Sequence, residues 1–144
     1  PESNEGRLGE ELGRMLLILE NATPNSLVFI NEAFASTNSR EGSLIAQDVM
    51  SALAVIGAKC FFVTHLYELA IKLENINKGI ESMGEGYGQL ISMTAQFEEN
   101  SGDSGREEES GIRRSYKILP GVPSKSSFAA DIAAQFGIRY IDFG

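Results

Sequence analysis

Ser-Leu-Val-Phe-Ile-Asn-Glu, residues 26–32, is the stretch that decides the fold. Its centre, from Leu27 to Ile30, is entirely apolar and leads directly into Asn31 and Glu32. Because such a run has no side for water, it predicts a strand buried on both faces, as in a parallel sheet covered by helices. Open α/β sheets bind ligands at the carboxyl ends of their strands, so Glu32 is the first candidate for chemistry. In the alternative, Asn31 and Glu32 only end the strand and face water.

A second apolar run, Cys-Phe-Phe-Val, predicts another buried strand over 59–64. Apolar residues at helical spacing between the two strands predict a helix over 44–56 that ends at Gly57. A strand, a helix and a strand in this order form a right-handed crossover unit with parallel strands. The polar ends of both strands then lie on one edge of the sheet, which brings Glu32 towards His65, the one histidine of the sequence.

The rest of the chain adds helices before and after this unit and a hairpin. Helical spacing predicts helices, and strict alternation of apolar with polar residues predicts strands that are half buried. The fold class is therefore α/β, with parallel strands, flanking helices and an antiparallel hairpin. The further predictions are helices over 7–21, 66–73 and 124–136, loops over 33–40 and 74–88, hairpin strands over 91–97 and 112–118 with a flexible acidic tip between them, and a short strand over 138–143.

Composition restricts the classes of function. With 144 residues, 42% of them hydrophobic, the chain is long enough for one globular domain. A net charge of −8 argues against direct wrapping of nucleic acid, which needs clustered Lys and Arg. The single cysteine, Cys60, excludes an internal disulfide and is expected to be a small core residue. Without a long apolar run or a signal-peptide pattern, we expect a soluble protein with no membrane partner, in the cytoplasm or associated with the nucleoid.

Few residues could carry chemistry. Glu32 can take a proton from water, and His65 can donate a hydrogen bond to a developing negative charge, although either could be structural. One histidine and one cysteine leave no metal cluster. The sequence also lacks Gly-x-x-x-x-Gly-Lys-Ser/Thr, the motif that holds nucleotide phosphates. The glycine-rich segment 79–88 lacks the Lys-Ser/Thr pair of that motif.

Three segments resemble the ATPase domain of the MutS family of mismatch-repair proteins. Leu-Glu-Asn-Ala-Thr-Pro-Asn-Ser-Leu-Val-Phe-Ile-Asn-Glu, residues 19–32, is similar to the segment that runs into that family's Walker B strand. Phe-Val-Thr-His-Leu-Tyr-Glu-Leu, residues 62–69, resembles the segment of its switch histidine. Tyr-Lys-Ile-Leu-Pro-Gly, residues 116–121, with Lys125-Ser126, resembles a late hairpin strand and turn. Order and spacing match over residues 7–138.

The resemblance implies the later half of an ABC-type, P-loop ATPase domain whose phosphate loop lies in the earlier half. Glu32 then matches the residue that orients or activates the attacking water, and His65 a residue that contacts the γ-phosphate region. Asn31 stands where the family has an aspartate that holds magnesium through water. The loop 33–39, which includes Ser36, and the first residues of the chain, which include Gly6 and Arg7, match segments that face the nucleotide bound by a partner subunit. The implied ligands are ATP and Mg²⁺, and the implied partners are a second MutS-like subunit, as a homodimer, and DNA held by other domains.

The chain departs from the family pattern at several of these positions. Asn31 lacks the charge of aspartate, although its amide oxygen can still accept a hydrogen bond from a magnesium-bound water. Residues 33–39 lack the usual Gly-Arg-Gly. Gly6-Arg7-Leu8 replaces Ser-Thr-Phe, and Ser127-Phe128 replaces Tyr-Gly. These differences indicate a divergent MutS-like protein and affect the rate of hydrolysis rather than the fold.

Two functions from different classes follow, and an unrelated α/β domain is the third possibility. In the first, the parent protein hydrolyses ATP with Glu32 and uses the cycle of ATP binding and hydrolysis to change how it binds DNA. In the second, ATP binding closes a dimer, and hydrolysis is slow or absent because of Asn31. The start at Pro1 without a methionine suggests a piece of a longer protein. For the 144 residues alone we expect no ATPase activity, weak nucleotide binding, and an exposed apolar patch or dimerisation.

Overall fold

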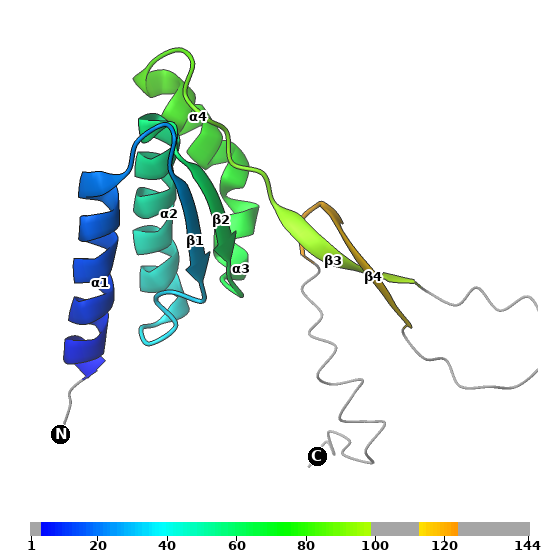
Figure 1. Cartoon of the computed structure of the whole chain (residues 1–144). Coiled ribbons are helices and arrows are strands. Elements are labelled where there is room, and N and C mark those ends of the chain that lie inside the picture. The colour runs from blue at the N-terminus through cyan, green and yellow to red at the C-terminus, as the bar shows by residue number, and fades with distance from the viewer. Residues whose placement is uncertain (1–3, 99–112, 124–144) are drawn as a thin grey trace, which may run out of the picture.

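The structure, a computed structural model, describes residues 4–98 and 113–123. These residues form a body in which helices cover one face of a parallel sheet, and an antiparallel hairpin that extends from it (Figure 1). The predicted acidic tip of the hairpin, the helix over 124–136 and the strand over 138–143 lie outside the described residues. In chain order the elements are α1 (Asn4–Asn21), β1 (Leu27–Asn31), α2 (Ser39–Ile56), β2 (Lys59–Val63), α3 (Tyr67–Ile71), α4 (Leu73–Met83), β3 (Met93–Glu98) and β4 (Arg113–Pro120).

β1 and β2 pair in parallel, as the crossover prediction requires. Leu27 lies opposite Lys59, and Asn31 lies opposite Val63. The pairing continues one residue further, because the backbone N–H of Glu32 donates to the carbonyl of Val63 at 2.8 Å. The carboxyl ends of the two strands are therefore level with each other, and the residues that follow them leave the sheet at one edge.

α2 connects the two strands and begins earlier than its apolar spacing predicts. The side chain of Asn38 accepts a hydrogen bond from the backbone N–H of Glu41 at 2.9 Å, which caps the helix before its first apolar residue, Leu44. Gly57 ends the helix with φ of 82°, a left-handed conformation that glycine adopts without strain. Side chains along one face of α2 are buried against the sheet and the other helices. They are Ala46, Val49, Leu53 and Ala54.

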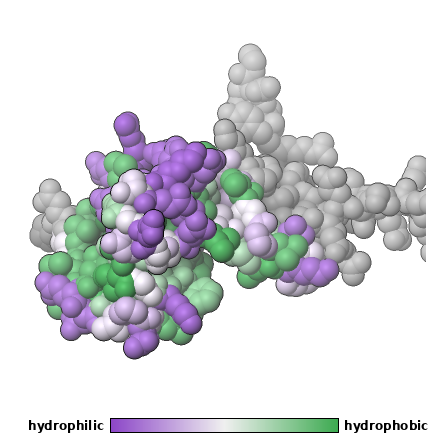
Figure 2. All heavy atoms as spheres, turned by 90° about the horizontal axis from the view of Figure 1, so that it is seen from above, coloured by the Kyte–Doolittle hydropathy of each residue, from purple (hydrophilic) through white to green (hydrophobic). Residues whose placement is uncertain are grey.

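The sheet is covered on one face only, so the prediction of a strand buried on both faces is wrong for the described structure. Ile30 is 4% exposed, whereas its neighbour Phe29 is 70% exposed. Phe29 stacks on Phe61 of β2 with ring centroids 5.3 Å apart, and Leu27 and Val63 extend the same exposed face. The cause is that the described helices pack against the opposite face. The expected apolar patch is thus present, and Figure 2 shows hydrophobic residues at the surface of the body.

α4 corrects the prediction that residues 74–88 are mostly loop. Asparagine and glycine give this segment a low helix propensity, which concealed the helical spacing of Ile76 and Ile80. Both isoleucines are buried, at 5% and 2% exposure, so tertiary packing outweighs propensity here. Asn77 then fixes the segment that follows, because its side chain donates to the carbonyl of Leu90 and accepts from the Leu90 N–H, each at 2.9 Å.

Truncating Ile80 tests whether α4 belongs to the core. Ile80→Ala removes a side chain that is 2% exposed, so the free energy of unfolding should fall by about 2–5 kcal/mol. Met83→Ala on the same helix is the control, because Met83 is 61% exposed and its loss should cost less than about 0.5 kcal/mol. Urea denaturation of both variants measures the difference. Equal losses would mean that α4 does not pack as described.

The hairpin is antiparallel as predicted, but its strands are not half buried. Met93 lies opposite Pro120, and a register shift follows Ala95. Tyr116 is 90% exposed and Ile118 is 66% exposed, and among the described elements β3 and β4 contact only each other. Alternating side chains provide a face that can be buried, but no described helix or strand lies against it (Figure 1).

Candidate functional site

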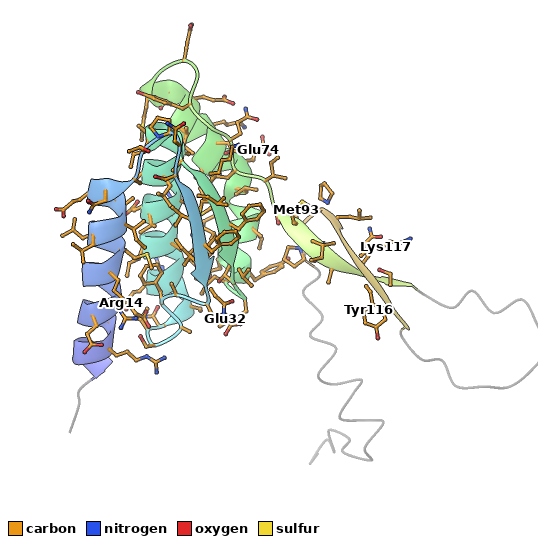
Figure 3. All side chains as sticks on the ribbon, viewed as in Figure 1. Arg14, Glu32, Glu74, Met93, Tyr116 and Lys117 are labelled. Atoms are coloured by element: carbon orange, nitrogen blue, oxygen red, sulfur yellow. The ribbon has the colours of Figure 1, made fainter. Side chains whose placement is uncertain are left out.

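Glu32 and His65 lie together at the carboxyl edge of the sheet, as the strand pattern predicts. Oε1 of Glu32 is 3.8 Å from Nδ1 of His65, and their side chains are 59% and 65% exposed. An exposed pair at this distance contributes little to stability, so both groups remain available to a ligand. Figure 3 shows Glu32 at the end of β1, far from the labelled hairpin residues Met93 and Tyr116.

Asn31 is the last residue of β1 and is exposed. Because side chains alternate along a strand, it lies on the same open face of the sheet as Phe29. Asn31 and Glu32 therefore project from consecutive positions at the strand end, one from the sheet and one from the following turn. This edge combines an amide, a carboxylate and an imidazole, which are groups that hydrogen-bond to water or to anions.

The loop between β1 and α2 has an unusual backbone. Glu32 has φ of 48° and Phe34 has φ of 65°, both in the left-handed region that side chains other than glycine rarely adopt. Phe34 is completely buried, which anchors the loop in the core. The hydroxyl of Ser36 is also buried and has no hydrogen-bond partner within the described part of the chain. A buried polar atom without a partner is uncommon in folded proteins and leaves this loop with one free acceptor and donor.

Gly6 and Arg7 lie in the first turns of α1, at the end of the molecule where β1 also ends (Figure 1). The Arg7 side chain is 74% exposed, and its Nε is 3.6 Å from Oε1 of Glu11. The structure therefore places all the sequence-predicted site residues at one end of the body. It brings only Glu32 and His65 within direct reach of each other.

Glu11 contacts the site loop, although no pattern in the sequence indicates it. Its Oε2 accepts a hydrogen bond from the backbone N–H of Phe34 at 2.9 Å, and its side chain is 20% exposed. Helical spacing gives no signal for this contact, because its partner is a backbone amide 23 positions away. The burial of a carboxylate on α1 is the feature that would have indicated the contact, and burial is not visible in the sequence.

Residues 4–98 and 113–123 contain neither a group of metal ligands nor a membrane-spanning helix. No three side chains of His, Cys, Asp or Glu group together there as metal ligands. Burial raises the pKa of the Cys60 thiol, and its sulfur lies 3.9 Å from that of Met50, which is consistent with the packing role predicted for it. None of the described helices is long and apolar enough to cross a membrane.

Comparison with known proteins identifies relatives over nearly all of the chain. A family model described as MutS domain V matches residues 2–136. Endonuclease MutS2 from Lacticaseibacillus casei is 27% identical over 95% of this chain, and the match covers 15% of that protein. DNA mismatch repair protein MutS from Thermus aquaticus is 31% identical over 89% of this chain and 13% of its own length. The chain thus spans about one seventh of the length of these curated relatives.

Proposed function

Because the chain belongs to the family of MutS domain V, we propose that it is the later part of an ATPase domain in a longer protein. That protein would couple ATP binding and hydrolysis to DNA binding in mismatch repair or related DNA processing. The observation that carries the proposal is the juxtaposition of Glu32 and His65 at the carboxyl edge of a parallel sheet. Family relatives named for mismatch repair and for endonuclease activity support the DNA-related part.

Glu32 has the chemistry and the exposure of a group that acts on water. A carboxylate that is 59% exposed can accept a hydrogen bond from a water molecule and orient it towards a phosphorus atom. His65, at 3.8 Å, can donate to a phosphate oxygen on which negative charge develops. Glu32 directly follows the last residue of β1, and His65 lies two residues after the end of β2, so the pairing of the strands brings both side chains to one edge of the sheet.

The described residues fit one part of an ATP–magnesium site. Asn31 can accept a hydrogen bond from a magnesium-bound water. Bound magnesium would supply positive charge that neutralises the phosphate oxygens. Because the described residues hold no cluster of metal ligands, the remaining contacts would come from elsewhere in the longer protein.

A second subunit would complete the site. Gly6 and Arg7 lie in the first turns of α1, where free backbone N–H groups and an exposed guanidinium favour an anion. We propose that this end of α1 and the loop containing Ser36 approach the nucleotide of a partner copy in a homodimer. DNA would be bound by other domains, since this chain carries a net charge of −8.

Asn31 favours a second candidate, a nucleotide-gated module that hydrolyses ATP slowly or not at all. Asn31→Asp in the full-length protein, assayed for magnesium-dependent ATP hydrolysis, separates the two. If the wild type already hydrolyses ATP, the added charge should raise turnover only a few-fold, on the order of 1 kcal/mol in the barrier. If the wild type binds ATP but hydrolyses it only at a background rate, Asn31→Asp should raise turnover clearly above that rate.

Asn25→Asp is the control, because it adds the same charge in the turn before β1, at the other end of the strand. It should leave turnover unchanged in either case. If the wild type and Asn31→Asp neither hydrolyse nor bind ATP, both candidate functions are wrong.

A further inference from the structure

Glu11 connects α1 to the loop that carries the proposed catalytic carboxylate. Its Oε2 accepts from the Phe34 N–H at 2.9 Å, and Phe34 lies two positions after Glu32. We propose that Glu11 is a positioning residue, which holds the backbone of this loop so that Glu32 faces the attacking water. This inference rests on the proposed hydrolysis for its functional part, but the contact itself does not depend on it.

The amide of Phe34 depends on Glu11 for its hydrogen bond. Phe34 is completely buried while Glu11 is in place, so its N–H has no contact with water in the intact loop. Buried backbone N–H groups are almost always paired, because an unpaired one loses the hydrogen bond that it made to water in the unfolded chain. Loss of Glu11 would therefore force the peptide between Ala33 and Phe34 to turn towards another acceptor or towards solvent.

The backbone around this peptide is already strained. Glu32 and Phe34 both have positive φ, at 48° and 65°. Such conformations persist only where the surrounding structure determines them. On the α2 side, a Cβ atom at Gly42 would lie 3.1 Å from the carbonyl oxygen of Phe34, so the helix packs directly on that group. α2 restrains the carbonyl of Phe34, and Glu11 restrains its N–H.

The second oxygen of Glu11 extends the connection to the start of α1. Oε1 lies 3.6 Å from Nε of Arg7, which belongs to the segment proposed to approach the partner's nucleotide. One carboxylate thus contacts both the residue proposed to act across the dimer and the loop that contains Glu32. Because Arg7 is 74% exposed and Phe34 is buried, the contact with the amide is the stronger restraint.

Glu11→Ala and Glu11→Gln test the assignment in two measurements. In the 144-residue chain, Glu11→Ala should accelerate hydrogen exchange at the Phe34 amide by about tenfold or more. In the full-length protein it should lower kcat by about 10- to 100-fold, with the KM for ATP changed less than about twofold, because a small displacement of a reacting group affects the chemical step most. Glu11→Gln keeps an acceptor oxygen and should retain most of both properties.

Glu10→Ala is the matched control, since Glu10 precedes Glu11 on α1 and is exposed; it should change neither measurement. Unchanged exchange at Phe34 in Glu11→Ala would overturn the restraint. Faster exchange with an unchanged kcat would overturn the positioning role while leaving the contact intact. A full-length protein without ATP hydrolysis would overturn the proposed function and with it the positioning role, whereas the exchange result would still stand for the contact.

Discussion

Glu32→Gln in the full-length protein is expected to slow ATP hydrolysis by about 10²- to 10⁴-fold, the range typical of a lost general base. Glutamine has nearly the same shape and keeps an acceptor oxygen, but it cannot take a proton. Glu32 is 59% exposed and only 3.8 Å from His65, so the change leaves packing and the strand end intact. The Kd for ATP, measured by equilibrium titration, should change by less than about threefold, because the base is needed for the chemical step and not for binding of the nucleotide.

The control for this change is Glu20→Gln, which neutralises an exposed carboxylate near the end of α1. It should leave the rate unaltered, so that a general effect of net charge can be separated from the chemistry of Glu32. Turnover in Glu32→Gln equal to the wild type would remove Glu32 from the mechanism. Loss of ATP binding together with turnover would instead assign Glu32 to nucleotide binding rather than to activation of water.

The local pattern around residues 26–32 predicts β1 and its pairing with β2 because both depend on short-range signals. An apolar run, a helix and a second apolar run allow few topologies, and the strand ends then bring Glu32 and His65 to one edge. Coverage of the second face of the sheet could not be predicted in the same way. Apolar residues at Phe29 and Phe61 indicate that the face can be buried, but they do not identify what buries it.

The other features that the sequence did not predict also depend on long-range packing. Low helix propensity predicts a loop where α4 forms, whereas the burial of Ile76 and Ile80 stabilises the helix. The hydrogen bond between Glu11 and Phe34 joins positions that are distant in the sequence. Glycine usually indicates a positive φ, but the residues with positive φ here are Glu32 and Phe34. The meeting of Glu32 and His65 at one edge was thus predictable from the sequence, while the contacts that hold the loop in place were not.

Phe34→Ala is expected to lower the free energy of unfolding by about 3–5 kcal/mol, because it removes a completely buried aromatic side chain. Phe34→Gly should cost about the same, although glycine is usually the less stable of these two residues. At φ of 65° alanine keeps a steric penalty of about 1–2 kcal/mol that glycine does not have. The greater entropy of glycine in the unfolded chain offsets about 0.4–1 kcal/mol of this advantage. Glycine also lacks the buried methyl group of alanine, which costs it about 0.8 kcal/mol more. The two variants should therefore have nearly the same stability, within roughly 0.5 kcal/mol.

The same pair of substitutions at Phe29 provides the comparison. Phe29 is 70% exposed and lies within β1, where the backbone is extended. Glycine should there be less stable than alanine by about 0.5–1 kcal/mol. Urea denaturation of the four variants measures both orders. If alanine exceeds glycine at position 34 by as much as it does at position 29, Phe34 does not hold the left-handed conformation described. The loop after Glu32 would then lack the strain that makes its restraint by Glu11 necessary.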